Sequence, residues 1–402
     1  MTAIDGTNTT NSSVSTTSFI DTLERTTASS FGSDGDRIKA LRAAYALISR
    51  LETPWDTVAR LAMTEPALGA YLKIFRDLQV FEKWHHLGSD LPQTDADLSA
   101  LTGAEPELLA RLTRHLAANN LLEEVSAGTY RQTAFTKSLL VPVFGSWPDY
   151  LYDGPLPCFY KMPEYLAKTG YKNPTSQGDG IFQYTKGCKG TMYDYYEQNS
   201  KEGATFNNIM GSVMTKKSML DLYPYEEPSD SLPNDSPTPL LVDVGGNVGH
   251  DIIKILTEQP DVASRLVLQD RPEVLELAKC PPGVQVAAHD FFTPQPVKGA
   301  RAYYIHAILH NWSDEPSRKI LSHLRDAMEP GYSKLLIHDH ILPAENVHPQ
   351  ASAYDLLMMA KLSSFERTES MWEGLLQSVG MKTKKIWSSP LATQSIIEAE
   401  LL

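Results

Sequence analysis

The second half of the chain alternates short apolar runs with segments of helical spacing. From Pro239 onward, "LLVDV", "LVLQD", "VQVAA", "RAYYIH" and "KLLIHD" are separated by segments such as "HDIIKILTEQ" and "EPSRKILSHLRDAM". Strands that alternate with helices form parallel sheets, because each helix returns the chain to the end of the sheet at which the preceding strand began. The pattern predicts an α/β domain over residues 237–402, with a mostly parallel sheet and helices on both faces. Ligands of such sheets bind beyond the carboxyl ends of the strands.

The first half of the chain has a different pattern. Apolar residues recur at helical spacing over residues 36–86, and "TDADLSALTGAEPELLARLTRHLAANN" is typical of helix, turn and helix. The following "EEVSAGTYRQTAF" resembles a hairpin, which would complete a winged-helix shape. We expect a disordered tail over residues 1–34, a helical and winged-helix dimerisation domain over 35–145, and a connecting region over 146–236 that lines the substrate pocket.

Charge and composition exclude several classes of protein. The formal net charge is −13, and acidic residues surround the basic ones of the predicted winged helix, so nucleic acid is not expected as a partner. No apolar run reaches the length of a membrane span, and the Ser/Thr-rich start lacks the features of a signal peptide. The three cysteines are far apart in sequence, which indicates a reducing compartment, and we expect a cytoplasmic protein.

A glycine turn follows the first strand of the α/β domain. In "LLVDVGGNVGH", Gly245 allows a tight turn and Gly246 lets backbone approach a ligand. The G-x-G-x-x-G pattern of dinucleotide sites fails here, because Asn247 and His250 stand where its second and third glycines would be. The turn therefore indicates a nucleoside ligand without a pyrophosphate.

Acidic side chains lie at the ends of three successive predicted strands. Asp243 precedes the glycine turn, Asp270 ends the next strand at the position typical of a ribose ligand, and Asp290 follows the third. Phe291, next to Asp290, could cover a flat ring. This set suits a nucleoside that carries a positive group, and S-adenosylmethionine is such a ligand.

The stretch "YYIHAILHNWSDE" contains two histidines, His306 and His310. A zinc site of the H-E-x-x-H type would need Glu after His306, where the chain has Ala307. His338 and His340 would have to add ligands, but on a strand they point to the face opposite their neighbour Asp339. We therefore predict no metal site.

Two acids favour a catalytic role for His310 over that of an ordinary core histidine. Asp339 ends a strand and Glu366 lies in "SSFERTESMW", so both can reach the edge of the sheet where His310 lies. Acidic partners hold an imidazole in one tautomer and stabilise the imidazolium that forms when it accepts a proton. The three residues predict a general base for a phenolic hydroxyl.

Five motifs in this order resemble the plant- and fungal-type S-adenosylmethionine-dependent O-methyltransferases, most closely those of fungal polyketide pathways. They are "LVDVGGNVGHD", "LVLQDRPEV", "AHDFFTPQPVKGARAYYIHAILHNWSDE", "GYSKLLIHDHILP" and "SSFERTESMWEGLLQSVG". The resemblance spans roughly residues 36–400. It implies a homodimer formed through the N-terminal domain and a Rossmann-like catalytic domain.

The resemblance also implies roles for individual residues. The cofactor site would comprise Ser218, Asp243, Gly245, Gly246, Asp270, Asp290, Phe291 and His306. His310 would be the general base, flanked by Asp339 and Glu366, and Met210 and Met214 would lie against the ring of an aromatic acceptor. Two differences bear on the strength of the base: Asn311 stands where Asp is commoner, and Asp339 where Glu is commoner.

These observations lead to two hypotheses. The first is methyl transfer from S-adenosylmethionine to a phenolic or enolic hydroxyl of an aromatic polyketide or related secondary metabolite. The alternative is a pericyclase or dehydratase-type cyclase on the same scaffold, which uses the positive sulfonium without transferring its methyl group. Retention of His310 favours methyl transfer.

Overall fold

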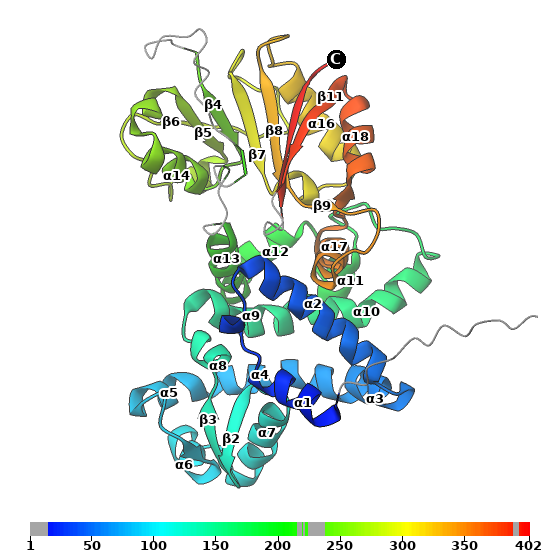
Figure 1. Cartoon of the computed structure of the whole chain (residues 1–402). Coiled ribbons are helices and arrows are strands. Elements are labelled where there is room, and N and C mark those ends of the chain that lie inside the picture. Colours follow the sequence, from blue (N-terminus) through cyan, green and yellow to red (C-terminus); the bar gives the residue numbers. More distant parts are fainter. Residues whose placement is uncertain (1–14, 215–218, 220–221, 224–237, 389–393) are drawn as a thin grey trace, which may run out of the picture. The chain divides into compact units, whose positions relative to one another are not determined.

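The computed structural model describes residues 15–214, 219, 222–223, 238–388 and 394–402 (Figure 1). The chain forms two compact units, Met1–Leu61 and Ala62–Leu402. No described helix is long and apolar enough to cross a membrane.

The first unit consists of helices that bury none of their residues. Its elements are α1 (Thr16–Arg25), η1 (Ala28–Ser30), α2 (Asp34–Leu51) and α3 (Pro54–Ala59). The predicted tail over residues 1–34 is therefore wrong from Thr16 onward, because Thr16–Arg25 and Ala28–Ser30 form helices there, with Phe19, Ile20 and Leu23 at helical spacing in the first. Residues 1–14 lie outside the described part of the chain. The four-part division of the chain remains a prediction.

The second unit begins with the predicted helix, turn, helix and hairpin. Its elements are η2 (Arg60–Thr64), which starts just before the boundary, α4 (Glu65–Asp77), α5 (Val80–Leu87), β1 (Gln93–Thr94), α6 (Asp95–Thr102), α7 (Pro106–Ala118), β2 (Leu122–Ser126), β3 (Thr129–Gln132) and α8 (Ala134–Ser138). Thr94 caps α6 by accepting from the Asp97 amide, and Gly103 ends that helix in the left-handed conformation. Gly128 turns the hairpin with a positive φ of 67°. These elements confirm the sequence pattern.

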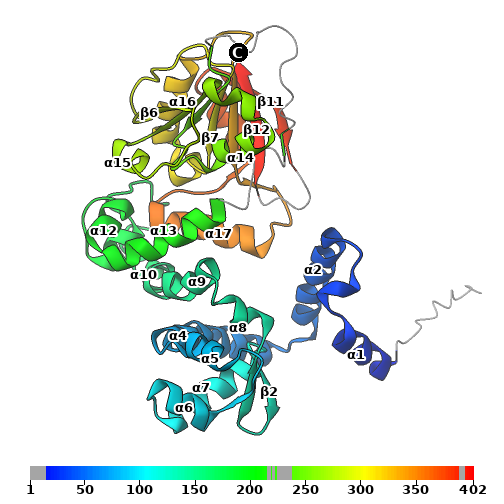
Figure 2. The ribbon, with the colours of Figure 1, turned by 90° about the vertical axis from the view of Figure 1, so that its left-hand side faces the viewer.

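A set of helices rich in aromatic residues follows. They are α9 (Pro142–Asp153), α10 (Pro155–Lys168), α11 (Ile181–Lys186), α12 (Met192–Gln198) and α13 (Ser200–Met214). Their core includes Cys158, Ile181, Phe182, Met192 and Tyr196, and it continues into α17 (Pro349–Leu362) through Ala360 and Leu362. In Figures 1 and 2, α12, α13 and α17 lie at the end of the sheet where β8 runs into β9.

The α/β domain contains a seven-stranded sheet in the order β11-β12-β8-β7-β4-β5-β6. Its strands are β4 (Leu241–Val244), β5 (Leu266–Asp270), β6 (Gln285–Ala288), β7 (Ala302–His306), β8 (Lys334–Asp339), β11 (Met381–Trp387) and β12 (Ser395–Leu401). The first five run parallel and confirm the predicted α/β class, while β12 is antiparallel to both of its neighbours. A short parallel pair, β9 (Ile341–Leu342) and β10 (Arg367–Thr368), lies beyond the end of β8.

Helices cover both faces of the sheet (Figures 1 and 2). On one face, α16 (Asp314–Arg325) and α18 (Glu369–Gln377) bury Ile320, Leu324, Trp372 and Leu376 against the strands. On the other face, α14 (His250–Glu258) buries Ile252 and Ile255, and the short η4 (Pro260–Arg265) and α15 (Pro272–Leu275) follow along the chain. The central strands β4, β5, β7 and β8 are buried on both sides, which is why they are mostly apolar, whereas the edge strands β6 and β11 are partly exposed.

Candidate active site

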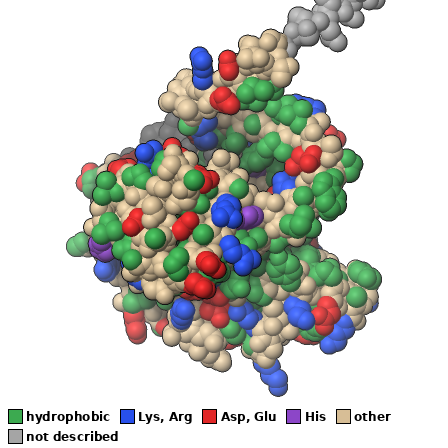
Figure 3. Space-filling view, turned by 90° about the horizontal axis from the view of Figure 1, so that it is seen from below, with side chains coloured by type: hydrophobic (Ala, Val, Ile, Leu, Met, Phe, Trp, Pro, Cys, Tyr) green, Lys and Arg blue, Asp and Glu red, His purple; other side chains and the backbone are tan. Residues whose placement is uncertain are grey.

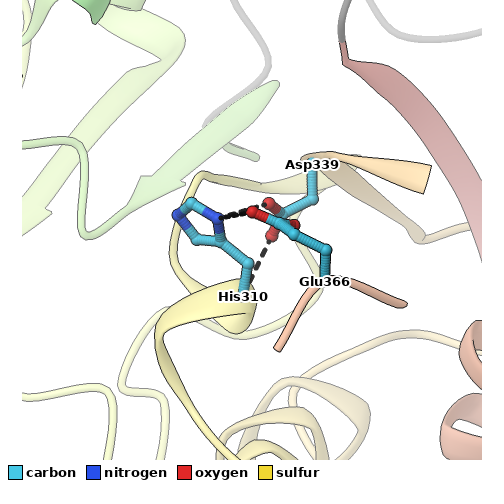
Figure 4. Close-up of side chains that lie close together, drawn as sticks. All are labelled: His310, Asp339 and Glu366. Carbon is cyan, nitrogen blue, oxygen red and sulfur yellow. Dashed lines mark hydrogen bonds and ion pairs between the residues drawn. The ribbon is translucent and has the colours of Figure 1, made fainter. Parts of the chain in front are cut away.

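His310 lies just beyond the end of β7, on the single turn η5 (Leu309–Asn311). Its Nδ1 is 3.0 Å from Glu366 Oε1 and 3.6 Å from Asp339 Oδ1, and its backbone N–H donates to Asp339 Oδ2 at 3.3 Å (Figure 4). Asp339 ends the adjacent strand β8, and Glu366 lies directly before β10. The structure therefore brings together the three predicted catalytic residues from three separate segments.

The two acids control the protonation of His310. Burial alone would lower the pKa of His310, but the charges of Asp339 and Glu366 outweigh it and raise the pKa to about 9. In turn, burial opposes ionisation of Glu366, but the imidazolium lowers the pKa of that carboxyl below its usual value. Burial raises the pKa of Asp339 despite the same imidazolium. The cluster therefore stabilises a proton on His310.

The tautomer of His310 follows from these contacts. Nδ1 faces Glu366, so it carries a proton that it donates to that carboxylate. Nε2 is the ring nitrogen left to exchange a proton with a ligand, and the side chain is 13% exposed. This geometry is that of an oriented general base.

The glycine turn after β4 has no room for side chains. Gly245 has a φ of 72°, and a Cβ there would lie 3.1 Å from Ile308 and 3.5 Å from Phe291. A Cβ on Gly246 would lie 2.3 Å from Asp243 Oδ2, so the second glycine is required by a carboxylate beneath it. The predicted tight turn is confirmed, and the turn lies beside the predicted ring-covering residue.

Three carboxylates lie close together under and beside this turn. Asp243 is fully buried, and neither of its carboxylate oxygens has a hydrogen-bond partner among the described residues. Burial, with the nearby charges of Asp251 and Asp270, raises the pKa of Asp243 well above its usual value. Burial also raises the pKa of Asp270, whose Oδ2 accepts from the Asn247 amide at 2.8 Å. Carboxyl groups whose ionisation is opposed by burial and by one another fit a cationic cofactor, because a nearby positive charge would favour their ionised forms.

The other predicted cofactor residues have different surroundings. Asp290 is exposed and caps its own loop, because its Oδ1 accepts from the Phe292 amide at 2.9 Å. Phe291 packs edge-on against Phe292 at 5.0 Å. The contacts of Asp290 and Phe291 with the adenine remain predictions.

His306 is buried, and protein atoms contact both of its ring nitrogens. Nδ1 is 2.7 Å from Asp251 Oδ2, and Nε2 is 3.3 Å from Gln394 Oε1. Its ring stacks on that of His338 at 4.0 Å. We therefore interpret His306 as a hydrogen-bond partner of Asp251. A direct contact between His306 and the cofactor remains a prediction.

The predicted acceptor residues are only partly described. Met210 lies half-buried on α13, and Met214 ends that helix. Ser218, predicted near the carboxylate end of the cofactor, lies outside the described residues. Sequence reasoning also placed His340 on the face opposite Asp339, but β8 ends at Asp339 and the His340 ring lies 6.1 Å from that of His310.

Sequence reasoning missed three residues around the site. Asp251 contacts His306, and its position in the first turn after the glycine motif could have indicated a role. Arg367 and Gln177 donate to carbonyls of the turn that carries His310. Arg367 directly follows Glu366 in sequence, whereas no sequence signal relates Gln177 to a turn 134 residues away.

The three predicted catalytic residues also place one potential metal-ligand atom each within 4.8 Å of one another. The 3.0 Å separation of His310 Nδ1 and Glu366 Oε1 is that of a charge-assisted hydrogen bond, which explains their spacing without an ion. Metal independence remains a prediction.

Comparisons with known proteins identify the family of the chain. Residues 170–382 match the family model of the O-methyltransferase domain. The O-methyltransferase mfmE of Annulohypoxylon moriforme is 53% identical over 385 residues, which cover 96% of this chain and 95% of that protein.

Solved structures are similar along nearly the whole chain. A structure of LepI in complex with SAM, and one described as a pericyclic reaction enzyme, each have a TM-score of 0.85 at 26% identity, covering 96% of this chain and 99% of theirs. OxaC in complex with SAH and oxaline has a TM-score of 0.80 at 25% identity, covering 95% and 96%. The cofactor is S-adenosylmethionine, and the chain belongs to the family of S-adenosylmethionine-dependent O-methyltransferases.

Proposed function

We propose that this O-methyltransferase methylates a phenolic or enolic hydroxyl of an aromatic polyketide or related secondary metabolite, with His310 as the general base. The observation that carries the proposal is the contact of His310 Nδ1 with Glu366 at 3.0 Å, which leaves Nε2 for the acceptor. The bound cofactor supplies an electrophilic methyl group on a sulfonium. An oxygen attacks such a methyl group efficiently only if its proton leaves as the new bond forms.

The chain's own residues divide this task. Nε2 of His310 accepts the hydroxyl proton, while Glu366 and Asp339 stabilise the resulting imidazolium. Asp243, Asp251 and Asp270 provide the negative surroundings in which a cationic cofactor is held. The oxygen loses its proton to His310 and gains the methyl group, so no further reactant is needed.

The surroundings of the site support an apolar, aromatic acceptor. The helices next to this end of the sheet bring together Tyr196 and Phe206, stacked at 4.9 Å, with Phe182, Met358 and Leu362 in the same cluster. Flat aromatic ligands bind among side chains of this kind, with a few polar groups to orient them.

The test is product analysis with methyl-labelled S-adenosylmethionine and a panel of aromatic polyketides. We expect label in the product and one S-adenosylhomocysteine per turnover, unaffected by EDTA. His310→Gln should lower kcat by roughly 10²- to 10⁴-fold, the usual contribution of a general base. His86→Gln, on the exposed surface of α5, is the matched control and should not change it.

Other outcomes would contradict specific parts of the proposal. A product formed without label would replace methyl transfer by cyclisation, and full activity of His310→Gln would remove the base assignment. Loss of activity in EDTA, restored by a divalent metal, would make the three catalytic residues a metal site.

We also propose a cytoplasmic homodimer formed through the N-terminal helices and the winged-helix elements α6, α7, β2 and β3. The support is apolar surface: α1, α2 and α3 bury none of their residues, and Tyr45 and Trp55 are 59% and 70% exposed. Exposed apolar surface of this extent is typical of a protein interface. The three cysteines are unpaired, as expected in a reducing compartment.

A role in binding nucleic acid is not favoured. Figure 3 shows one face of the molecule, on which acidic and basic side chains are interspersed. Phosphate recognition needs a concentrated basic surface instead.

A further inference from the structure

Arg367 is among the largest fully buried side chains of the described chain. Its guanidinium lies 4.6 Å from the ring centre of Phe365 and 5.1 Å from that of Trp372. A buried guanidinium is costly unless each of its donors finds an acceptor. The positions of those acceptors therefore indicate what the residue is for.

The donors of Arg367 go to the turn that carries His310. Nη1 donates to the carbonyl of Leu309 at 2.9 Å, and Nη2 donates to that of Trp312 at 2.9 Å. Nε and Nη2 also contact Oδ1 of Asp314, at 3.2 and 2.9 Å, at the start of α16. The rigid, planar guanidinium of Arg367 thus bonds to the backbone on both sides of His310.

Side chains also hold the two carbonyls in between. Ser364 Oγ donates to the carbonyl of His310, and Gln177 Nε2 donates to that of Asn311. Each carbonyl oxygen from Leu309 to Trp312 therefore accepts a hydrogen bond from a side chain outside the turn. A turn needs no such bonds to form, because its carbonyls can be satisfied by water. The side-chain bonds to all four carbonyls therefore indicate that the position of this turn matters.

Left-handed backbone at two nearby positions supports the same conclusion. Ala307 has a φ of 51° and Ser363 a φ of 52°, and neither is glycine. Such conformations persist only where the surroundings enforce them, and they cluster at functional sites. Asn311 Nδ2 donates to the carbonyl of Ala307 at 3.0 Å, a bond that the commoner Asp could not make.

We propose that Arg367 is a positioning residue for methyl transfer, holding the turn Leu309–Asn311 so that His310 stays against Glu366 and Asp339. Ser364 and Gln177 complete the same clamp. This inference rests on the proposed role of His310 as the base. It assigns Arg367 no contact with cofactor or acceptor.

The first test compares Arg367→Lys with Arg318→Lys. Both arginines contact Asp314, but Arg318 is 46% exposed and reaches the carboxylate from α16. Lysine keeps the charge at either position but cannot bridge the carbonyls of Leu309 and Trp312. We expect Arg367→Lys to lower kcat roughly 10- to 100-fold, since small misplacements of a base have such effects. The acceptor KM and cofactor Kd should stay within about twofold, and Arg318→Lys should resemble the unchanged enzyme.

The decisive readout is the ionisation of His310, measured by NMR titration and assigned by the signal that is lost in His310→Gln. If the clamp holds the imidazole on its acids, Arg367→Lys should lower the pKa of His310 toward the free value of about 6.5. A purely structural role would lower the melting temperature and leave this pKa unchanged in the folded protein, which would overturn the proposal. A shifted pKa with full activity would instead support the clamp and contradict the base assignment.

A second pair of variants applies if Arg367→Lys fails to fold. Ser364→Ala removes the donor to the His310 carbonyl. Ser333→Ala removes a buried donor to the carbonyl of Ala300, outside the site, and also the acceptor of the Glu329 amide, so it is the more severe change of the two. We expect Ser364→Ala, but not Ser333→Ala, to lower both kcat and the pKa of His310. If Ser364→Ala and Ser333→Ala changed kcat and the pKa of His310 equally, this result would contradict the clamp.

Discussion

At the scale of single residues, the proposed base His310 and the acids Asp339 and Glu366 share one proton. Because the pKa of His310 is raised to about 9, the resting enzyme carries an imidazolium at neutral pH. The imidazolium binds an acceptor whose hydroxyl has already ionised, whereas the neutral imidazole binds an acceptor that still carries its proton. Both routes give a complex that holds one proton between His310 and the acceptor oxygen. We therefore expect Asp339 and Glu366 to set the pH at which the enzyme works.

The first prediction is a pH profile. For an acceptor with an ordinary phenolic pKa of about 10, kcat/KM should rise with pH up to the pKa of His310, about 9, and fall above that of the acceptor. Asp339→Asn removes one acid and should move the rising limb to lower pH. A rising limb near 6.5 in the unchanged enzyme would show that the acids do not raise the pKa of the base.

The same ionisation has a consequence for stability, with a definite sign. The folded-state pKa of His310 lies above its unfolded value, so its contribution is fully present below about pH 6.5 and is lost as pH rises through about 9. Maximal activity is therefore expected in a pH range where this contribution is declining.

At the scale of elements, periodicity predicted the parallel strands and their helices because both faces of the sheet are buried. The antiparallel strands β11 and β12 were missed. In "MKTKKIW" the alternating residues are mostly charged, since β11 is an edge strand with one exposed face, and its pattern does not differ from that of a polar loop. Asp270 and Asp339 at strand ends, and Asp243 one residue before the end of β4, were predicted because ligand sites follow topology. The clamp on η5 depends instead on contacts between distant segments.

The second prediction concerns the glycine turn. Gly246→Ala should abolish measurable cofactor binding and destabilise the fold by about 1 to 3 kcal/mol, the usual cost of overpacking, because its Cβ would lie 2.3 Å from Asp243 Oδ2. Gly374→Ala on α18 is the matched control, with nothing within 4 Å of its Cβ. Gly374→Ala should raise the free energy of unfolding by up to about 1 kcal/mol, because alanine favours a helix more than glycine does. Calorimetry with S-adenosylmethionine and thermal unfolding measure both effects, and unchanged binding in Gly246→Ala would contradict the steric argument.

At the scale of the whole molecule, the N-terminal unit carries apolar side chains that its own helices leave exposed. Leu41, Tyr45 and Ile48 lie at i, i+4 and i+7 on α2, so they share one face, and each is at least 45% exposed. Sequence periodicity could predict this face but not what covers it, because a second copy of the chain leaves no separate signal in the sequence.

The third prediction is the oligomeric state. The unchanged protein should be a dimer by light scattering after size exclusion, and Leu41→Glu combined with Ile48→Glu should shift it to monomer by burying charge at the interface. Arg42→Glu, on the same helix, controls for the added charge. A monomeric unchanged protein, or a dimer unaffected by the double substitution, would contradict the proposed interface.

The clamp on η5 also affects how the protein reaches its active state. The bond from Gln177 to Asn311 closes a loop of 134 residues, and the contact of His310 with Glu366 closes one of 56. Contacts this distant along the chain are slow to form, because loop-closure entropy opposes them until the surrounding elements have packed. We therefore expect His310 to be oriented only after both the sheet and the helices beside it have formed, so that a partly folded chain has no methyltransferase activity.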